Sequence, residues 1–210
     1  MPTKIYDVSV PIHSGMHVYP GDPRFRARPV RSLADGDSFQ LHKIALGNHT
    51  GTHVDAPLHF LKDGPTITDL PLEVMNGRAR VIQVHNTEKI DVPELREILL
   101  VDDFRVLFKT KNSLLWNSRK HFSKDYAYLT PEAAQYLTEN GIKLIGFDYL
   151  SVDRYGDTSY PVHKILLQNQ VVLIESLNLS EVDAGEYELF CLPLPLSGMD
   201  AAPARVILRK

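Results

Sequence analysis

The stretch His49-Thr-Gly-Thr-His-Val-Asp-Ala-Pro-Leu-His59 holds three of the nine histidines of the chain and the carboxylate of Asp55. Imidazole nitrogens and carboxylate oxygens are ligands that Zn, Mn and Fe accept, and no cysteine lies nearby to offer a softer one. The stretch therefore predicts a metal site. The alternative is a polar loop whose histidines only hydrogen-bond to their surroundings, but so dense a group favours the metal.

The spacing within this stretch also limits its backbone conformation. An unbroken strand, at roughly 3.3 Å per residue, would separate His49 from His53 by about 13 Å. A regular helix would bring these two together but would turn Asp55 away from His53. Gly51 lies between the two histidines and can supply a tight bend. We therefore expect a bend followed by an extended segment, Thr52–Asp55, with His53 and Asp55 on one face.

The end of the stretch is expected to turn back toward the same place. Pro57 cannot continue a regular strand, so it can redirect the chain and bring His59 to the cavity that the earlier histidines line. His59 is then a candidate for a different task from the ligands.

Residues 49–60 resemble the H-x-G-T-H-x-D-x-P-x-H-F motif of the cyclase-type metal-dependent hydrolases, a family that includes bacterial kynurenine formamidases and isatin hydrolases. Four further blocks match in family order: Tyr19–Pro23 (similar to W-P-G-D), Gly146–Asp153 (G-x-D-x-x-S-V-D), His163–Leu179 (H-x-x-L-L, then I-x-E-x-L-N-L) and Leu192–Pro203 (L-P-L-x-x-x-G-x-D-A-x-P). The chain is identified as a member on these five blocks. The resemblance implies an α/β protein with the swivelling β/β/α fold, a curved mixed sheet covered by helices.

The resemblance also implies the ligand set. His49, His53 and Asp55 would bind one ion and His163 would complete a second, with Asp55 and Glu175 bridging the pair. From the residues alone, His163 could simply pack or cap a helix, and Glu175 could end a strand in solvent. The implied cofactor is Zn, with two ions expected, or Mn. Some family members use one metal, so the number of ions stays open.

Composition and the apolar pattern agree with one domain over residues 1–210. The chain is 43% hydrophobic and carries a net charge of −3, which gives no general attraction to nucleic acid or an anionic membrane. A single cysteine, no signal-peptide core at the start and no long apolar run favour the cytoplasm. The basic stretch Arg24–Arg28 alternates with period two, which predicts the exposed face of an edge strand rather than a nucleic-acid site.

The secondary structure is expected to mix strands and helices. Strands are predicted at Ile5–Val10, Arg80–Val84, Arg105–Thr110, Lys143–Phe147, Val171–Glu175, Leu189–Leu192 and Arg205–Leu208. Helices are predicted at Pro131–Asn140, with Thr130 as N-cap and Gly141 as the stop, at Pro93–Leu100 after Asp91, and at Pro161–Asn169.

A metal site of this kind predicts hydrolysis. A metal ion lowers the pKa of bound water from about 16 toward about 7, so hydroxide becomes available for attack at neutral pH. The amide nitrogen must then be protonated as it leaves. His59 holds the family's catalytic position and is the candidate general acid/base, because an unshifted imidazole titrates near pH 7. The alternative is that His59 only orients a ligand.

The amino-terminal block bears on the substrate. In kynurenine formamidases the tryptophan of W-P-G-D stacks on the aromatic substrate, and Tyr19 takes that position here. Tyrosine keeps an aromatic face, so N-formyl-L-kynurenine is the leading substrate, with a cyclic amide or a lactone as the alternative. Tyr149, Tyr155 and Tyr160 could line the pocket or simply pack. A non-catalytic, metal-binding member is the third interpretation. The resemblance further implies a homodimer or higher oligomer.

Overall fold

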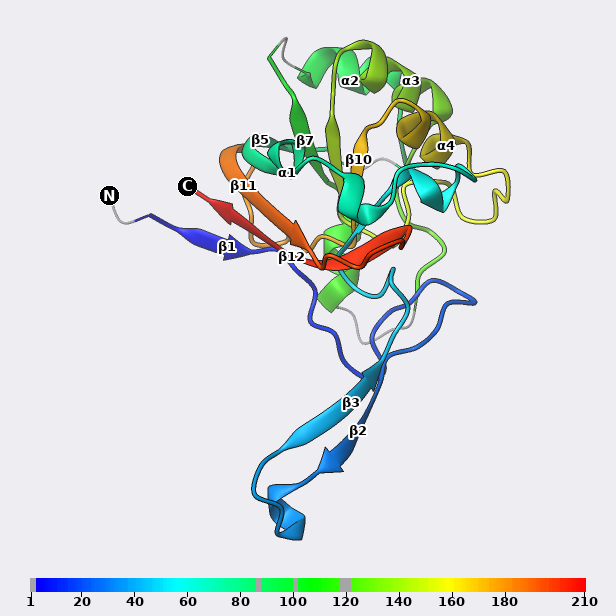
Figure 1. The fold of residues 1–210 in the computed structure, drawn as a ribbon. Helices are drawn as coiled ribbons and strands as arrows, with labels where there is room; N and C mark the ends of the chain where they lie inside the picture. The colour runs from blue at the N-terminus through cyan, green and yellow to red at the C-terminus, as the bar shows by residue number, and fades with distance from the viewer. Residues whose placement is uncertain (1–2, 86–87, 100–101, 118–121) are drawn as a thin grey trace.

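The computed structural model describes residues 3–85, 88–99, 102–117 and 122–210 (Figure 1). Its strands are β1 Ile5–Asp7, β2 Arg26–Arg31, β3 Leu41–Ala45, β4 His53–Asp55, β5 Asn76–Gln83, β6 Lys89–Ile90, β7 Arg105–Lys109, β8 Tyr128–Leu129, β9 Leu144–Phe147, β10 Val172–Glu175, β11 Gly185–Pro193 and β12 Ala201–Arg209. Its helices are α1 Leu72–Met75, α2 Val92–Ile98, α3 Pro131–Glu139 and α4 Pro161–Gln168, with 3₁₀ turns η1 Leu33–Asp35, η2 Pro57–His59, η3 Ile67–Asp69 and η4 Lys111–Asn117.

The main sheet has eight strands in the order β1-β12-β11-β5-β7-β9-β10-β4, and β4 also pairs with β12. This last pairing closes the sheet into a barrel and leaves β1 outside the ring. Strands β5, β7, β9 and β10 run parallel, whereas β4, β11 and β12 pair antiparallel with their neighbours. The expected curved mixed sheet is therefore confirmed, and closure removes the open edges that an exposed sheet would have.

Successive side chains along the parallel strands point to opposite faces of the sheet, and they pack into two separate cores. In β7, Val106 and Phe108 pack toward the helices with Leu137 of α3, while Leu107 between them packs inside the barrel with Ile174 of β10. This is the pattern expected of strands that are buried on both faces. Figure 1 shows α2, α3 and α4 together on one side of the sheet, which is the side that the first core fills.

The three predicted helices form, each within one or two residues of its predicted start and end. Thr130 caps α3 by accepting a hydrogen bond from the Ala133 amide, and Asp91 caps α2 by accepting one from the Val92 amide. Helix α2 ends at Ile98, before the predicted limit of Leu100, which lies outside the described residues. Among the described residues, no helix is long and apolar enough to cross a membrane.

The basic stretch Arg24–Arg28 was expected to form the exposed face of an edge strand, and Arg26 and Arg28 do lie exposed on such a strand, β2. Within the described part of the chain, β2 pairs only with β3, and every residue of both strands is exposed. Figure 1 shows this hairpin standing away from the barrel, so neither of its faces meets a core. Period-two spacing cannot distinguish an edge strand from a free ribbon, because both expose alternating side chains.

Candidate metal centre

Strand β4 places the first candidate ligands in the wall of the barrel. In the antiparallel register, His53 lies opposite Glu175 of β10, and Asp55 lies opposite Ala201 of β12. Gly51, immediately before the strand, has a φ of 72°, so the expected bend occurs at this glycine. The bend lets His49 fold back toward Asp55 instead of continuing away along a strand.

The candidate ligands converge on Asp55. Nδ1 of His49 lies 3.0 Å from Oδ1 of Asp55, and Nε2 of His53 lies 3.3 Å from the same oxygen. From α4, Nε2 of His163 lies 3.6 Å from Oδ2 of Asp55 and 3.2 Å from Oε1 of Glu175. Oε2 of Glu175 lies 3.6 Å from Nε2 of His53. All five residues of the predicted ligand set therefore meet in one cluster.

Two of these histidines are oriented by their other ring nitrogen. Nδ1 of His53 lies 2.8 Å from the carbonyl oxygen of Gly51, and Nδ1 of His163 lies 2.5 Å from a carboxylate oxygen of Asp153. Each Nδ1–H donates to its oxygen, which turns each Nε2 toward the carboxylates. Partners of this kind fix the tautomer of a metal-binding histidine and raise its basicity.

Asp200, just before β12, holds two further histidines in place. Its carboxylate accepts hydrogen bonds from Nε2 of His49, at 2.9 Å, and from Nδ1 of His59, at 3.0 Å. Asn48 donates a third, at 2.6 Å. His59 therefore keeps Nε2 available to the cavity. Sequence reasoning assigned no role to Asp200 or Asp153, although both lie within blocks that carry the family resemblance.

The charges in this cluster depend on one another. Burial opposes ionisation of Asp55, but the facing imidazoles, His49 first, hold the pKa of this carboxyl well below its usual range. Burial also opposes protonation of His49, yet Asp55 and Asp200 raise its pKa to about 9. Burial lowers the pKa of His59, so this imidazole is neutral at pH 7.

The unpaired atoms of the cluster fit a bound cation. Both carboxylate oxygens of Asp55 and Nε2 of His53 are buried and make no hydrogen bond with any described residue. Such atoms are costly to bury unless a cation binds them. Two sets of ligand atoms each lie within 4.8 Å of one another: one from His49, Asp55 and His59, the other from His53, Asp55 and Glu175. Asp55 belongs to both sets, and every donor is nitrogen or oxygen, which suits Zn or Mn.

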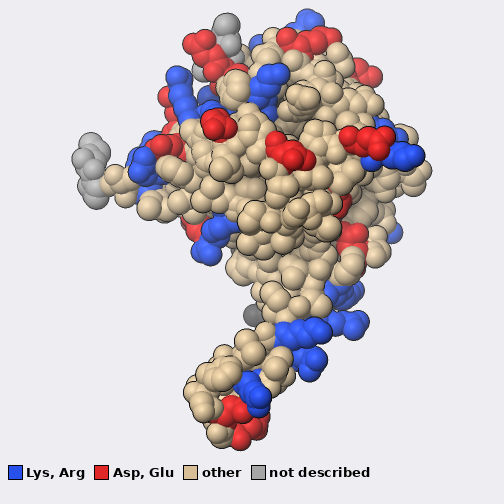
Figure 2. All heavy atoms as spheres, in the orientation of Figure 1, with Lys and Arg blue, Asp and Glu red and all other residues tan. Residues whose placement is uncertain are grey.

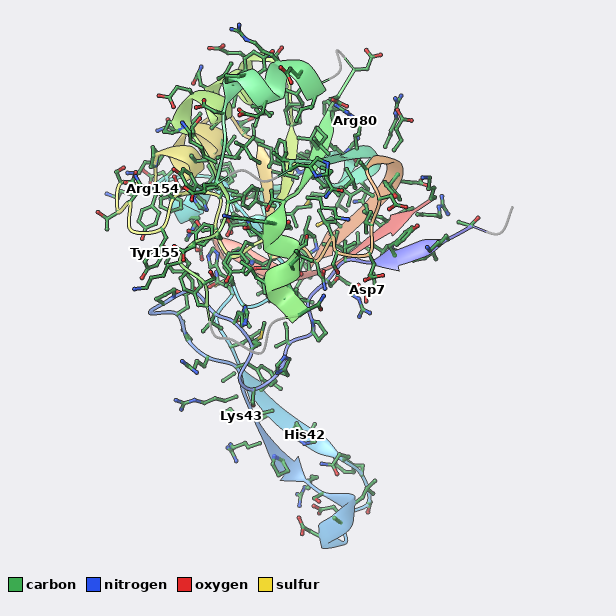
Figure 3. The ribbon with its side chains drawn as sticks, turned by 180° about the vertical axis from the view of Figure 1, so that it is seen from behind. Asp7, His42, Lys43, Arg80, Arg154 and Tyr155 are labelled. Atoms are coloured by element: carbon green, nitrogen blue, oxygen red, sulfur yellow. The ribbon has the colours of Figure 1, made fainter. Side chains whose placement is uncertain are left out.

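An aromatic cavity of about 270 Å³ opens onto this cluster. Besides four of the five candidate ligands and His59, its walls include Tyr19, Asp22, Phe60, Leu150, Ser151 and Tyr160. Tyr149 is fully buried, and Tyr155 lines a different hollow, although its ring lies 6.3 Å from the ring of Tyr19. Figure 3 shows Tyr155 beside Arg154 on the surface of the barrel body. Of the three tyrosines considered alongside Tyr19, only Tyr160 lines the cavity.

The family model for putative cyclases matches residues 6–154. The chain belongs to this family. A kynurenine formamidase from Geobacillus thermodenitrificans is 38% identical over 204 residues, which cover 97% of this chain and 96% of that protein. A solved structure described as a predicted metal-dependent hydrolase from Bacillus stearothermophilus is 32% identical, with a TM-score of 0.86 and coverage of 100% and 99%.

The same fold extends to more distant proteins. Isatin hydrolase A from Labrenzia aggregata superposes with a TM-score of 0.81 over 99% of this chain and 93% of that one, at 22% identity. At this identity the likeness concerns the fold alone. Proteins whose sequences differ widely can therefore share this barrel fold.

The first prediction concerns how substitutions in the candidate metal cluster change the metal content of the protein. His53→Ala removes a buried nitrogen and should lower metal content, measured by elemental analysis after reloading, to a small fraction of the parent value. Asp200→Asn keeps every candidate ligand but weakens the orientation of His49 and His59, so affinity should fall by about 10- to 100-fold. Undiminished metal in His53→Ala would contradict the site.

The second prediction is that metal binding releases protons at neutral pH. The pKa of His49 is raised from 6.5 to about 9, so the metal-free protein holds this proton below pH 9, and a metal must displace it. The apparent affinity should therefore rise with pH up to about 9. Calorimetry at pH 7 in buffers of different ionisation enthalpy measures the protons released. His49→Gln should release one proton fewer, and an equal release would contradict the assignment.

Proposed function

We propose that this protein is a metal-dependent amidohydrolase that cleaves N-formyl-L-kynurenine into L-kynurenine and formate. The proposed ligands are His49, His53, Asp55, His163 and Glu175, holding one or two ions of Zn or Mn. The near full-length similarity to a kynurenine formamidase supports the substrate, and the buried nitrogen and oxygen cluster supports the metal. We propose that the whole chain acts as one domain.

The observation that carries this proposal is the pairing of the cluster with His59. Asp55 offers two buried oxygens that make no hydrogen bond with a described residue, and His59, held by Asp200, lies in the same group of ligand atoms. An ion bound by the cluster would activate a water molecule and polarise the carbonyl of an amide. A site that only binds metal needs no additional titrating side chain, so His59 favours catalysis over a binding role.

His59 can move the proton that amide cleavage requires. Because its Nδ1–H donates to Asp200, its Nε2 carries a lone pair and lines the cavity. Burial keeps the ring neutral at pH 7, so Nε2 can take a proton from the attacking water and return it to the leaving nitrogen. Asp200 stabilises the imidazolium that forms between these two events.

The cavity walls suit an aryl group. Tyr19, Phe60 and Tyr160 supply aromatic faces around the opening, and the rings of Phe60 and Tyr160 lie 5.2 Å apart. Tyr19 is itself fixed by a contact of 5.4 Å between its ring and that of Phe122. An aryl formamide can therefore place its ring against these aromatic side chains while its formyl carbon faces the metal cluster. We place the reaction in tryptophan breakdown in the cytoplasm, where the buried free thiol of Cys191 stays reduced.

The third prediction tests the reaction with a panel of substrates. Metal-loaded protein should hydrolyse N-formyl-L-kynurenine and simple aryl formamides faster than isatin or lactones, as followed by absorbance. His59→Ala should keep its metal and fold but lose about 10²- to 10⁴-fold in rate on formamides. The loss should be smaller for an activated ester, whose leaving group needs less protonation.

Two results would overturn these assignments. Faster hydrolysis of isatin than of every formamide would transfer the function to cyclic amides. Loss of metal in His59→Ala would make this residue a ligand, in keeping with its place in one of the two candidate ligand sets.

We propose that the protein is a homodimer joined through the β2–β3 hairpin. A free two-stranded ribbon is at best marginally stable in water, yet this one exposes Phe39, Leu41 and Ile44 by 56%, 47% and 58%. The barrel offers a matching apolar groove of about 480 Å³, lined by Ile12, Leu192 and Leu194 among others. Two copies can therefore cover both apolar surfaces through one symmetric exchange of hairpins.

The fourth prediction is that charges on the hairpin dissociate this dimer. The double variant Phe39→Asp, Ile44→Asp should shift the mass measured by light scattering from a dimer to a monomer at micromolar concentration. Leu72→Asp is a matched control, because Leu72 is 57% exposed on α1, away from the hairpin, and should leave the dimer intact. A monomeric parent protein would refute the proposal.

A further inference from the structure

A second hollow adjoins the aromatic cavity at the tight turn Tyr19-Pro-Gly-Asp22. This hollow has a volume of about 200 Å³ and shares Tyr19 and Asp22 with the cavity over the metal cluster. Its walls also include His17, Arg24 and Phe122. A molecule that extends from the metal cluster past Tyr19 therefore enters a space where a carboxylate and a guanidinium both lie within reach.

The turn explains why Asp22 faces both spaces. The amide of Asp22 donates a hydrogen bond of 3.0 Å to the carbonyl oxygen of Tyr19, and Gly21 between them has a φ of 104°. Glycine adopts this conformation readily, as the third residue of a type II turn must. The turn brings the backbones of Tyr19 and Asp22 together, and both residues line the cavity as well as the second hollow.

Both charged groups are available to a ligand. Among the described residues, none forms an ion pair or a side-chain hydrogen bond with Asp22 or Arg24. The other carboxylate that lines the cavity, Glu175, is buried and belongs to the metal cluster. Asp22 is therefore the acidic group at the entrance that the metal does not require.

We propose that Asp22 and Arg24 recognise the two charges of an α-amino acid head on the substrate, Asp22 the ammonium and Arg24 the carboxylate. This inference rests on the proposed formamidase function and deepens it. The formamide end reaches the metal cluster, the aryl ring lies against Tyr19, and the zwitterionic head extends into the second hollow. Opposite charges in this order select an amino acid derivative over a neutral aryl formamide.

The test compares two substrates that differ only in the head. N-formyl-L-kynurenine carries the zwitterion, whereas N-formyl-2-aminoacetophenone has the same formamide and aryl ketone without it. Asp22→Asn and Arg24→Gln should each raise KM for the first substrate by about 10- to 100-fold, the range for hydrogen bonds to charged groups. The kcat for that substrate, both constants for the neutral one and the metal content should stay within about twofold of the parent.

Matched controls lie on an exposed turn nearby. Lys62→Gln and Asp63→Asn remove one charge of each sign from residues that line neither hollow, and they should leave the ratio of KM values unchanged. Equal changes for both substrates in Asp22→Asn, or lost metal, would show that Asp22 acts on the cluster and would overturn the proposal. Unchanged KM values in both variants would overturn it as well.

A binding measurement separates this inference from the proposed reaction. Calorimetry should show L-kynurenine binding to the metal-loaded protein at least 10-fold more tightly than 2-aminoacetophenone, and Asp22→Asn should remove the difference. If the protein cleaves formamides but binds both compounds equally, the head site is wrong and the function stands. If it cleaves no formamide yet keeps this preference, the function is wrong and the head site stands.

Discussion

The carboxylate of Asp55 is the constraint on which this molecule depends. It has no solvent-exposed surface and makes no hydrogen bond with a described residue, so nearby positive charge must balance it. The histidines supply that charge in the metal-free protein, and a cation can replace their protons. Strand β4, which carries Asp55, also closes the barrel between β10 and β12. The three residues of β4 therefore close the barrel and also place Asp55 at the centre of the candidate metal site.

The local features of the chain could be predicted because each depends on neighbouring residues. The caps of α2 and α3, the bend at Gly51 and the alternation of the buried strands follow from residue type and spacing. The distant part of the cluster could also be predicted, because the family blocks include His163 and Glu175. These residues lie more than 100 residues beyond His53. Without the family blocks, packing or capping explained His163 equally well, and a solvent-exposed strand end explained Glu175.

Other features could not be predicted because they depend on distant contacts. The closing pair of β4 with β12 joins Asp55 to Ala201, and no local pattern specifies that partner. Asp200 gains its role only when β12 brings it to His49 and His59. The separation of the β2–β3 hairpin from the main sheet could not be predicted for a related reason, since exposed alternation also fits an edge strand of a larger sheet. The second hollow likewise forms only when Arg24 and Phe122, which are far apart in the sequence, come to line the same space.

The long sequence separation within the site has a consequence for biosynthesis. His49 and Asp200, which share a hydrogen bond, are 151 residues apart, so a ribosome adding about 5–20 residues per second needs roughly 8–30 s to travel between them. During that interval the nascent chain presents its early histidines without the carboxylates that complete the cluster. An ion bound during that interval would have only part of the candidate ligand set and of the residues that orient it, because Glu175 and Asp200 come late in the chain. The complete set would be available to discriminate among ions only after β10 and β12 have joined the barrel.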